Sequence, residues 1–190
     1  MRKNMQQLKK LAAFPTIHTK RLTLRQLTHE DAEQLYAYYA NESVYRYLDW
    51  NGPESIEHSK QNIDRWNKGF EQGWIIRFAI VDNETNTVIG TIFLSDFHGK
   101  RAEIGFELSQ YYWRRGIMSE AMREVLYLGF QQLHLQRIQA FVAEENVASR
   151  QLFNSFNFKE EGLLRQYETH SVTGECNDML VYSLIQDAKG

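Results

Sequence analysis

The stretch Trp113–Glu124, WRRGIMSEAMRE, decides how the rest of the chain is interpreted, because a predicted strand ends there and an amphipathic helix begins. Arg114, Arg115 and Gly116 fall in the predicted turn, and Ser119 is placed to cap the helix. Backbone N–H groups at a helix start lack intrahelical partners and carry partial positive charge. The stretch can therefore hold a phosphate group, although a glycine before a capped helix also occurs as an ordinary turn.

The composition of the chain excludes several classes of protein. Its 190 residues, 43% hydrophobic and 24% charged, are typical of one soluble globular domain. A formal net charge of −2 provides no overall basic field for nucleic acid. The single cysteine, Cys176, excludes an internal disulfide framework, and the six histidines lack the close spacing of a metal site. We therefore expect a cytoplasmic protein with no metal and no nucleic-acid partner.

The N-terminal segment is basic, but its apolar part, LAAF, is too short for the core of a signal peptide. No later apolar run approaches the length of a membrane span. We predict a tail or short helix over residues 1–13, then a single domain over residues 14–188, with no membrane association. No repeat, low-complexity segment or linker divides the chain.

Periodicity predicts the order of elements as strand, helices, three strands, helix, strand, helix and two strands. The predicted strands lie at 19–28, 74–82, 87–97, 101–108, 137–143, 158–167 and 176–185. Helices are predicted after Thr28, near 44–48, through Ile56 to Phe70, after the opening stretch, and from a cap at Asn146 to Asn157, which can take the left-handed conformation that closes a helix.

Two features of this order call for an explanation in terms of function. In the strand RAEIGFEL, Glu103 and Glu107 lie on the same face, which is ordinary for a solvent-facing edge strand but also suits a chemical role. The aromatic residues Tyr45, Tyr47 and Trp50 gather in one short segment. They either pack helices onto the sheet or line a substrate pocket.

The segment RAEIGFELSQYYWRRGIMSEA, followed by ENVASRQLFNSFNF, resembles the GNAT superfamily of acetyl-CoA-dependent N-acetyltransferases. Within it, the chain is similar to the ribosomal-protein-alanine N-acetyltransferases over roughly residues 14–185. The specific pair is W-x-x-G-x-x-S/T-E-A at Trp113–Ala121, then N-x-x-S at Asn146–Ser149. The resemblance implies an α/β (α+β) fold with a mixed, mostly antiparallel central sheet of about seven strands. Strands 4 and 5 splay apart, and helices flank the sheet.

The resemblance also implies acetyl-CoA as cofactor, with CoA as product. The usual Q/R-x-x-G-x-G/A loop has Trp113 at its first position and Met118 at its last, so backbone donors from Arg115 to Ser119 gain importance. A backbone N–H of Leu108 or Ser109 is the expected donor to the oxyanion. The expected cofactor-binding residues are Leu108, Ser109, Arg114, Arg115, Gly116, Ile117, Met118, Ser119, Asn146, which resembles the residue that binds the pantetheine arm, and Phe153.

For catalysis, the resemblance implies direct attack of an amine on a thioester. Glu103 or Glu107 is the candidate base, with Glu103 modestly favoured, and water is the alternative. An α-amine has a reference pKa of about 7.7 to 8.0, so a strong base is not essential. Other members of the superfamily often carry a Tyr that protonates the departing thiolate, but here that position is Phe153, which has no hydroxyl. Ser149, one helical turn earlier, resembles the serine proposed as that acid in the ribosomal-protein branch.

The acceptor that the resemblance implies is a primary amine, namely the N-terminal α-amine of a ribosomal protein, and Tyr47, Trp50 and Trp74 are expected to line its pocket. A polyamine or an aminoglycoside is the alternative acceptor. A polyamine favours a strongly acidic pocket, which the aromatic segment does not obviously offer. A non-catalytic acetyl-CoA-binding regulatory domain is an alternative of another class. Aromatic residues and the last strands can also form a homodimer interface.

Overall fold

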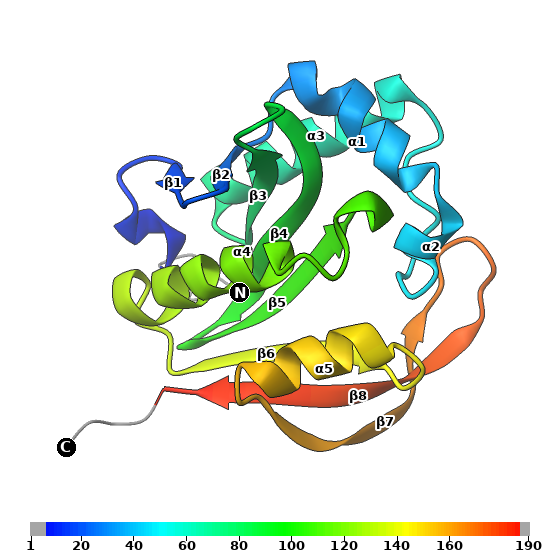
Figure 1. Cartoon of the computed structure of the whole chain (residues 1–190). Helices are drawn as coiled ribbons and strands as arrows, with labels where there is room; N and C mark the ends of the chain where they lie inside the picture. Colours follow the sequence, from blue (N-terminus) through cyan, green and yellow to red (C-terminus); the bar gives the residue numbers. More distant parts are fainter. Residues whose placement is uncertain (1–6, 187–190) are drawn as a thin grey trace.

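The structure is a computed structural model, and it describes residues 7–186. An eight-stranded sheet has the order β1-β2-β3-β4-β5-β6-β8-β7 (Figure 1). Neighbouring strands are antiparallel except for the parallel pair β5 and β6. The strands are β1 (Ile17–His18), β2 (Leu22–Gln26), β3 (Ile75–Asp82), β4 (Thr87–His98), β5 (Arg101–Leu108), β6 (Arg137–Ala143), β7 (Lys159–Thr169) and β8 (Cys176–Ile185). The predicted mixed α/β sheet is confirmed, and the short β1 is the additional strand.

The helices follow the predicted order. The main ones are α1 (Ala32–Tyr39), α2 (Glu42–Tyr45), α3 (Ile56–Gln72), α4 (Ile117–Tyr127) and α5 (Val147–Ser155). Short 3₁₀ turns are η1 (Leu8–Lys10), η2 (His29–Asp31) and η3 (Gln110–Tyr112), and η4 (Leu128–Gln132) continues α4 as a π-helix. Within residues 7–186, no helix is long and apolar enough to span a membrane.

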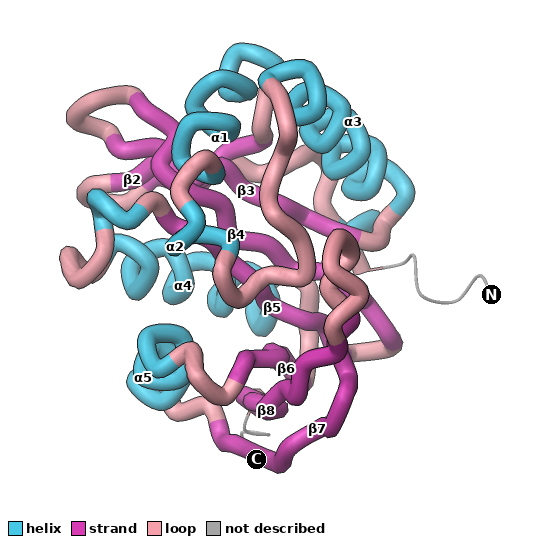
Figure 2. Tube along the Cα trace, turned by 90° about the vertical axis from the view of Figure 1, so that its right-hand side faces the viewer, coloured by secondary structure: helices cyan, strands magenta, loops and turns pink. Residues whose placement is uncertain are grey.

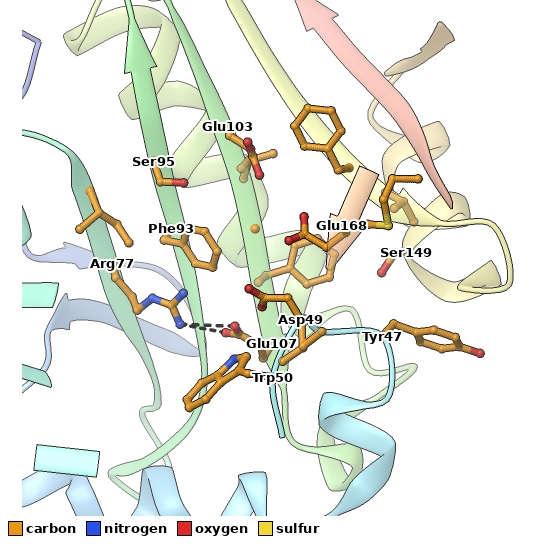
Figure 3. Close-up of a pocket in the computed structure, with 18 of the residues that line it drawn as sticks. Tyr47, Asp49, Trp50, Arg77, Phe93, Ser95, Glu103, Glu107, Ser149 and Glu168 are labelled. Atoms are coloured by element: carbon orange, nitrogen blue, oxygen red, sulfur yellow. Dashed lines mark hydrogen bonds and ion pairs between the residues drawn. The ribbon is translucent and has the colours of Figure 1, made fainter. Parts of the chain in front are cut away.

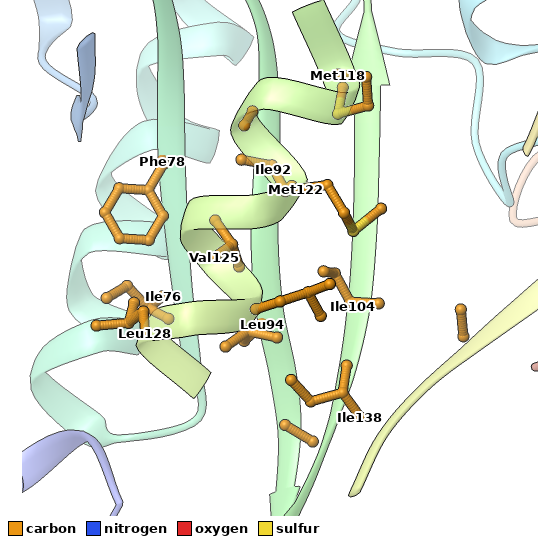
Figure 4. Packing of buried hydrophobic residues seen from close by; sticks show 14 of the residues in the cluster. Ile76, Phe78, Ile92, Leu94, Ile104, Met118, Met122, Val125, Leu128 and Ile138 are labelled. Carbon is orange, nitrogen blue, oxygen red and sulfur yellow. The ribbon is translucent and has the colours of Figure 1, made fainter. Parts of the chain in front are cut away.

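The core has two parts, one on each face of the sheet. On one face, Met118, Met122 and Val125 of α4 lie over sheet residues that include Ile92 and Ile104 (Figure 4). The spacing of these α4 residues gives the helix one apolar stripe. On the other face, α1 and α3 pack against β3 and β4. Burial on both faces fixes the ends of the central strands, where the functional residues lie.

Local sequence signals explain several helix ends. The Thr28 N–H donates to Asp31 Oδ2 at 2.8 Å, which confirms the predicted cap at the start of the first helical segment. Asn146 Oδ1 accepts from the Ser149 N–H at 3.1 Å, and Asn157 has φ 62°, as predicted for the two ends of α5.

The predicted cap at Ser119 is wrong. Gly116, with φ 71°, occupies the N-cap of α4, and Ser119 is the third helical residue with no capping hydrogen bond. Glycine adopts the left-handed conformation without the steric cost of a Cβ atom. The chain therefore turns into the helix earlier than the serine suggests, and Ser119 contributes to the first turn instead of preceding it.

Strands β5 and β6 separate along their length. They pair only where Arg101–Glu103 face Arg137–Gln139, while β5 continues to Leu108 and β6 continues to Ala143. Figures 1 and 2 show the opening, with α4 on the β5 side and α5 on the β6 side. The predicted splay is thus confirmed. Because β5 lies between β4 and β6, it is not the edge strand for which a solvent-facing Glu103 and Glu107 would be ordinary.

The N-terminal segment contributes to the core. Leu8 in η1 is only 2% exposed and belongs to the cluster beneath α4. Lys10 Nζ donates to the Leu133 carbonyl oxygen at 3.0 Å. Residues Leu8–Lys10 of the segment predicted as a tail or short helix form η1, whereas residues 1–6 and the predicted domain end at residue 188 lie outside the described residues.

Candidate active site

Two cavities, each of about 730 Å³, meet where β5 and β6 separate. The first, which we call the cofactor cleft, is bounded by the start of α4 and by α5. The second, the acceptor cavity, extends from the same point between α3, β5 and β7. Both cavities are lined by Tyr47, Leu48, Phe106, Glu107, Asn146 and Ser149. A donor molecule and an acceptor molecule can therefore meet at these shared residues.

The start of α4 forms one end of the cofactor cleft. Arg114 and Gly116 have φ values of 58° and 71°, so the backbone reverses twice just before the helix. The N–H groups of the first helical turn, at Ile117, Met118 and Ser119, precede the first intrahelical donor, Glu120, which bonds the Gly116 carbonyl oxygen. These donors and the helix dipole point at the same end of the cleft. An anion fits there without any basic side chain buried beside it.

The structure separates the ten predicted cofactor residues into two groups. Seven of them line the cleft: Leu108, Arg114, Gly116, Ile117, Met118, Ser119 and Asn146. Ser109, Arg115 and Phe153 do not line it. The Arg115 carbonyl oxygen accepts a hydrogen bond from Arg21 Nη1 at 2.8 Å, and the Arg115 guanidinium lies over the Tyr112 ring. Phe153 is buried and packs against Phe106 with ring centroids 5.7 Å apart.

The backbone at the end of β5 distinguishes the two expected oxyanion donors. The Ser109 N–H already donates to the Ile89 carbonyl oxygen at 2.8 Å. Residues along an antiparallel pair alternate in the direction of their N–H groups, so Leu108 directs its N–H away from β4 and toward the splay. The Leu108 carbonyl oxygen accepts from Trp113 Nε1 at 2.8 Å, which holds this end of the strand in place. Leu108 is therefore the better placed donor.

Helix α5 presents Asn146 and Ser149 to both cavities. The cap from Asn146 Oδ1 to the Ser149 N–H fixes the first turn, and Ser149 is half-buried. Its hydroxyl makes no hydrogen bond with any residue in the range 7–186, so the proton is available to a bound molecule. One turn later, Phe153 packs into the core and offers no polar atom.

Glu107 is engaged in a buried network. Its carboxylate lies 3.3 Å from Arg77 Nη1 and accepts a hydrogen bond from Thr91 Oγ1. Arg77 is itself sandwiched between the rings of Trp66 and Phe93, at 4.2 and 3.9 Å from their centroids. Removing one partner of a buried ion pair leaves an uncompensated charge. Glu107 therefore acts as a structural anion at the junction of the cavities, and its partners compete with any role as a base.

Glu103 has a different environment. It lines the acceptor cavity and is half-buried. Burial, together with the negative charges of Asp96 and Glu168, raises the pKa of Glu103 to about 7, although Arg101 acts in the opposite direction. A carboxylate with this pKa exchanges a proton readily near neutral pH. Of the two predicted carboxylates, Glu103 is the one suited to general base chemistry.

The acceptor cavity contains two further carboxylates, which the sequence analysis did not predict. Asp49 lies in the loop after α2, and Glu168 lies near the end of β7 (Figure 3). The Ser171 N–H donates to the Asp49 carbonyl oxygen at 2.7 Å, which joins the two segments. No local pattern signals this meeting, because it depends on how the β7–β8 turn folds back. The acceptor cavity is consequently more acidic than its aromatic residues suggested.

The aromatic segment serves both of the functions that its composition allowed. Tyr47, Trp50 and Trp74, the predicted acceptor residues, all line the acceptor cavity, and Tyr47 also lines the cofactor cleft. Trp66 is only 4% exposed and packs in the core, yet it also lines the cavity. Tyr45 packs against the same core cluster. Structural packing and formation of the cavity are therefore combined in this region.

Comparison with known proteins identifies the family. Residues 21–159 match the acetyltransferase (GNAT) domain. The chain belongs to the GNAT acetyltransferases. The uncharacterised N-acetyltransferase YoaA of Bacillus subtilis is 38% identical over 178 residues, covering 91% of this chain and 98% of YoaA. The ribosomal protein uS5-alanine N-acetyltransferase of Escherichia coli is 25% identical over 176 residues, covering 87% of this chain and 88% of that protein.

The fold agrees with this assignment. A GNAT-family acetyltransferase structure from Bacillus anthracis superimposes with a TM-score of 0.77 at 24% identity, covering 90% of this chain and 98% of that one. GNAT acetyltransferases use acetyl-CoA, and other solved structures with this fold hold coenzyme A. The protein is thus an N-acetyltransferase.

The residues of the cofactor cleft suit the binding of acetyl-CoA. Its N–H groups at the start of α4 suit a pyrophosphate, and the gap between β5 and β6 leaves backbone groups free to bind a pantetheine arm. A Cβ atom added at Gly116 would meet only the Arg21 guanidinium, at 3.6 Å, so the space around the turn is open. Arg114 and the first turn of α4 would hold the phosphates, and Asn146 would face the arm.

We expect Gly116→Ala to weaken acetyl-CoA binding. The residue has φ 71°, and a left-handed conformation costs a residue with a side chain about 1 to 2 kcal/mol. Isothermal titration calorimetry measures the change in Kd. Gly174→Ala is the matched control, because Gly174 has φ 72° in the β7–β8 turn, outside the cleft. It should lower the free energy of unfolding similarly without changing the Kd, and equal Kd changes in both variants would contradict the role of Gly116.

Proposed function

We propose that this GNAT acetyltransferase modifies the N-terminal α-amine of a protein, and that a ribosomal protein is its substrate. The observation that carries the proposal is the junction of the cofactor cleft with an open, aromatic-walled cavity of about 730 Å³ at Ser149. Such a cavity accommodates the first residues of a chain. Similarity to the uS5-alanine N-acetyltransferase over 87% of this chain supports the same acceptor class.

Glu103 prepares the acceptor for reaction. An ammonium group has no free electron pair and must lose a proton before its nitrogen can attack. Glu103, in its deprotonated form, takes that proton directly or through one water. Its pKa of about 7 lies near the reference pKa of an α-amine, about 7.7 to 8.0, so the transfer is nearly balanced at neutral pH.

Bond formation takes place between the two cavities. The thioester of the bound acetyl-CoA supplies the acetyl group. The amine nitrogen forms a bond to the acetyl carbonyl carbon, the carbon–sulfur bond breaks, and the nitrogen releases its second proton to solvent, which leaves a neutral amide. The Leu108 N–H at the splay stabilises the charge that develops on the acetyl oxygen. Ser149 donates its hydroxyl proton to the departing sulfur and regains a proton from solvent.

An unbiased acceptor survey tests the proposal. The purified enzyme is incubated with acetyl-CoA and either a library of N-terminal peptides, including those of ribosomal proteins, or a panel of small amines. Thiol release gives the rates, and mass spectrometry locates the acetyl group. Acetylation of peptide α-amines is the expected result. Turnover confined to small amines or to lysine ε-amines would overturn the acceptor assignment.

A small polyamine is the second candidate acceptor, and one observation favours it. Asp49, Glu103 and Glu168 bring three carboxylates to the acceptor cavity, which the aromatic segment by itself did not predict. A small cation with several amines would bind these groups by charge. The same survey decides between the two acceptors, since it compares peptides and polyamines under identical conditions.

Acetyl-CoA should stabilise the folded protein. A ligand that binds only the native state adds about 2.7 kcal/mol at a hundred times its Kd. Differential scanning fluorimetry with increasing acetyl-CoA therefore should show a rising midpoint. Dephospho-coenzyme A and free pantetheine serve as graded controls. A midpoint that does not depend on acetyl-CoA would contradict the assignment of the cofactor cleft.

A further inference from the structure

The acceptor cavity holds more negative than positive side chains. Its lining includes four carboxylates against two guanidinium groups, namely Asp49, Glu103, Glu107 and Glu168 against Arg65 and Arg77. Arg77 is already paired with Glu107, and Arg65 is exposed on the surface of α3. Asp49, Glu103 and Glu168 form no ion pair with any described residue. We call these three residues the carboxylate triad.

The members of the carboxylate triad come from three separate segments and face one space (Figure 3). Burial and the charge of Asp49 raise the pKa of Glu168, and Glu168 in turn raises the pKa of Glu103. Like charges brought together are unfavourable unless a cation joins them. Among residues 7–186, no group of three or more His, Cys, Asp or Glu is arranged to hold a metal ion. A positively charged group of a bound molecule can supply this counter-charge.

Asn62 provides a second, independent indication of a bound group. This α3 residue is 5% exposed and lines the acceptor cavity, yet its amide makes no hydrogen bond with any residue of the described chain. Its buried Nδ2 is a donor without a partner, which is costly until a bound molecule supplies an acceptor atom. The oxygen of the same amide can accept from an ammonium or guanidinium group. Trp50 and Trp74 also line the cavity, and indole rings attract an ammonium or guanidinium group through cation–π interaction.

The reacting amine accounts for only part of this negative charge. In the proposed mechanism Glu103 takes the proton of that amine, and this leaves Asp49 and Glu168 without a counter-charge. We propose that the acceptor carries a second ammonium or guanidinium group, which binds between Asp49 and Glu168 and reaches the Asn62 amide. This inference rests on the proposed function and narrows the substrate to amines with an additional positive charge.

Such a charge can belong to a basic side chain close to a protein N-terminus or to the far end of a small diamine. Two pairs of acceptors separate these sources. The first pair is an Ala-Lys and an Ala-norleucine N-terminal peptide, otherwise identical. The second pair is 1,4-diaminobutane and butylamine. In each pair, only the second charge differs, so kcat/KM from thiol release reports its contribution directly.

For the wild-type enzyme we expect the charged member of one pair to have a kcat/KM at least tenfold higher. Asp49→Asn and Glu168→Gln should each reduce that preference, the ratio of the two kcat/KM values within a pair, severalfold. Both carboxylates also raise the pKa of Glu103, and a change in that pKa affects both members of a pair, so the ratio isolates the contribution of the second charge. Glu71→Gln, an exposed carboxylate on α3 outside both cavities, is the matched control and should keep the full preference. A preference in the peptide pair indicates a protein acceptor, and one in the amine pair indicates a small molecule.

Equal kcat/KM values within both pairs would overturn the second-charge inference and leave the acetyltransferase function intact. If no amine is acetylated, the proposed acceptor assignment fails, and binding still tests the inference. Calorimetry of the coenzyme A complex then compares the affinity of each charged acceptor with that of its uncharged partner. Tighter binding of the charged member, lost in Glu168→Gln, supports the inference, and equal affinities overturn it.

Discussion

Ser149→Ala is expected to lower kcat by about a hundredfold, the lower range for loss of a general acid. The serine hydroxyl is the polar group that α5 offers at the junction of the cavities, since Phe153 one turn later is buried without a hydroxyl. Thiol release at saturating acetyl-CoA measures the change. The Kd of acetyl-CoA should stay within twofold, because the Ser149 N–H, which Asn146 caps, is retained in alanine.

Ser155→Ala is the control for this variant. Ser155 lies on the same helix and lines the cofactor cleft, but its hydroxyl donates to the Leu152 carbonyl oxygen at 2.7 Å. Its removal should leave kcat unchanged. Ser149→Thr keeps a hydroxyl and should recover part of the rate. An alanine variant with wild-type kcat would show that solvent protonates the departing thiolate.

Glu103→Gln is expected to reduce kcat/KM by about a hundredfold at neutral pH and to remove a pH dependence. The pKa of Glu103 is raised to about 7, and a base acts only when deprotonated. The wild-type kcat/KM should therefore rise as pH increases through about 7 and then level. The glutamine variant lacks this rise. Measurements with an acceptor of constant protonation state over this range isolate the contribution of Glu103.

A second substitution shifts the profile without touching the base. Asp96 raises the pKa of Glu103 through its negative charge and forms an ion pair with Arg101 at 3.2 Å. Asp96→Asn removes that charge and frees Arg101, and both changes lower the pKa of Glu103. The midpoint of the profile should move to lower pH. A profile that keeps its midpoint in Asp96→Asn and its shape in Glu103→Gln would assign the titration to another group.

Sequence patterns predicted the elements whose signals are local. The strand predicted at Cys176–Ile185, after the turn that contains Gly174, has the bounds of β8, and Asn146 marked the start of α5 through its own capping bond. The signal at Ser119 failed, because the conformational freedom of Gly116 moved the helix start upstream. Capping and turn residues thus predicted the ends of these elements, except where a glycine in the left-handed conformation started the helix earlier.

The charged residues of the site could not be assigned from local patterns. The partners of Glu107 lie on two other strands, Arg77 on β3 and Thr91 on β4, so its burial depends on strand register. Glu168 lies in the acceptor cavity with Asp49, and the turn after its strand bonds to the loop of Asp49. These contacts join segments far apart in the sequence, so the surroundings of each carboxylate could not be predicted from local patterns.

The gap between β5 and β6 also has a consequence for inhibition. Because the cofactor cleft and the acceptor cavity open into each other there, one molecule can occupy both cavities at the same time. Coenzyme A joined through its sulfur to an acceptor analogue would bind the second part at a high effective concentration. Such a bisubstrate ligand should bind much more tightly than either half alone, although it makes no new contact. Its acceptor half should set its selectivity.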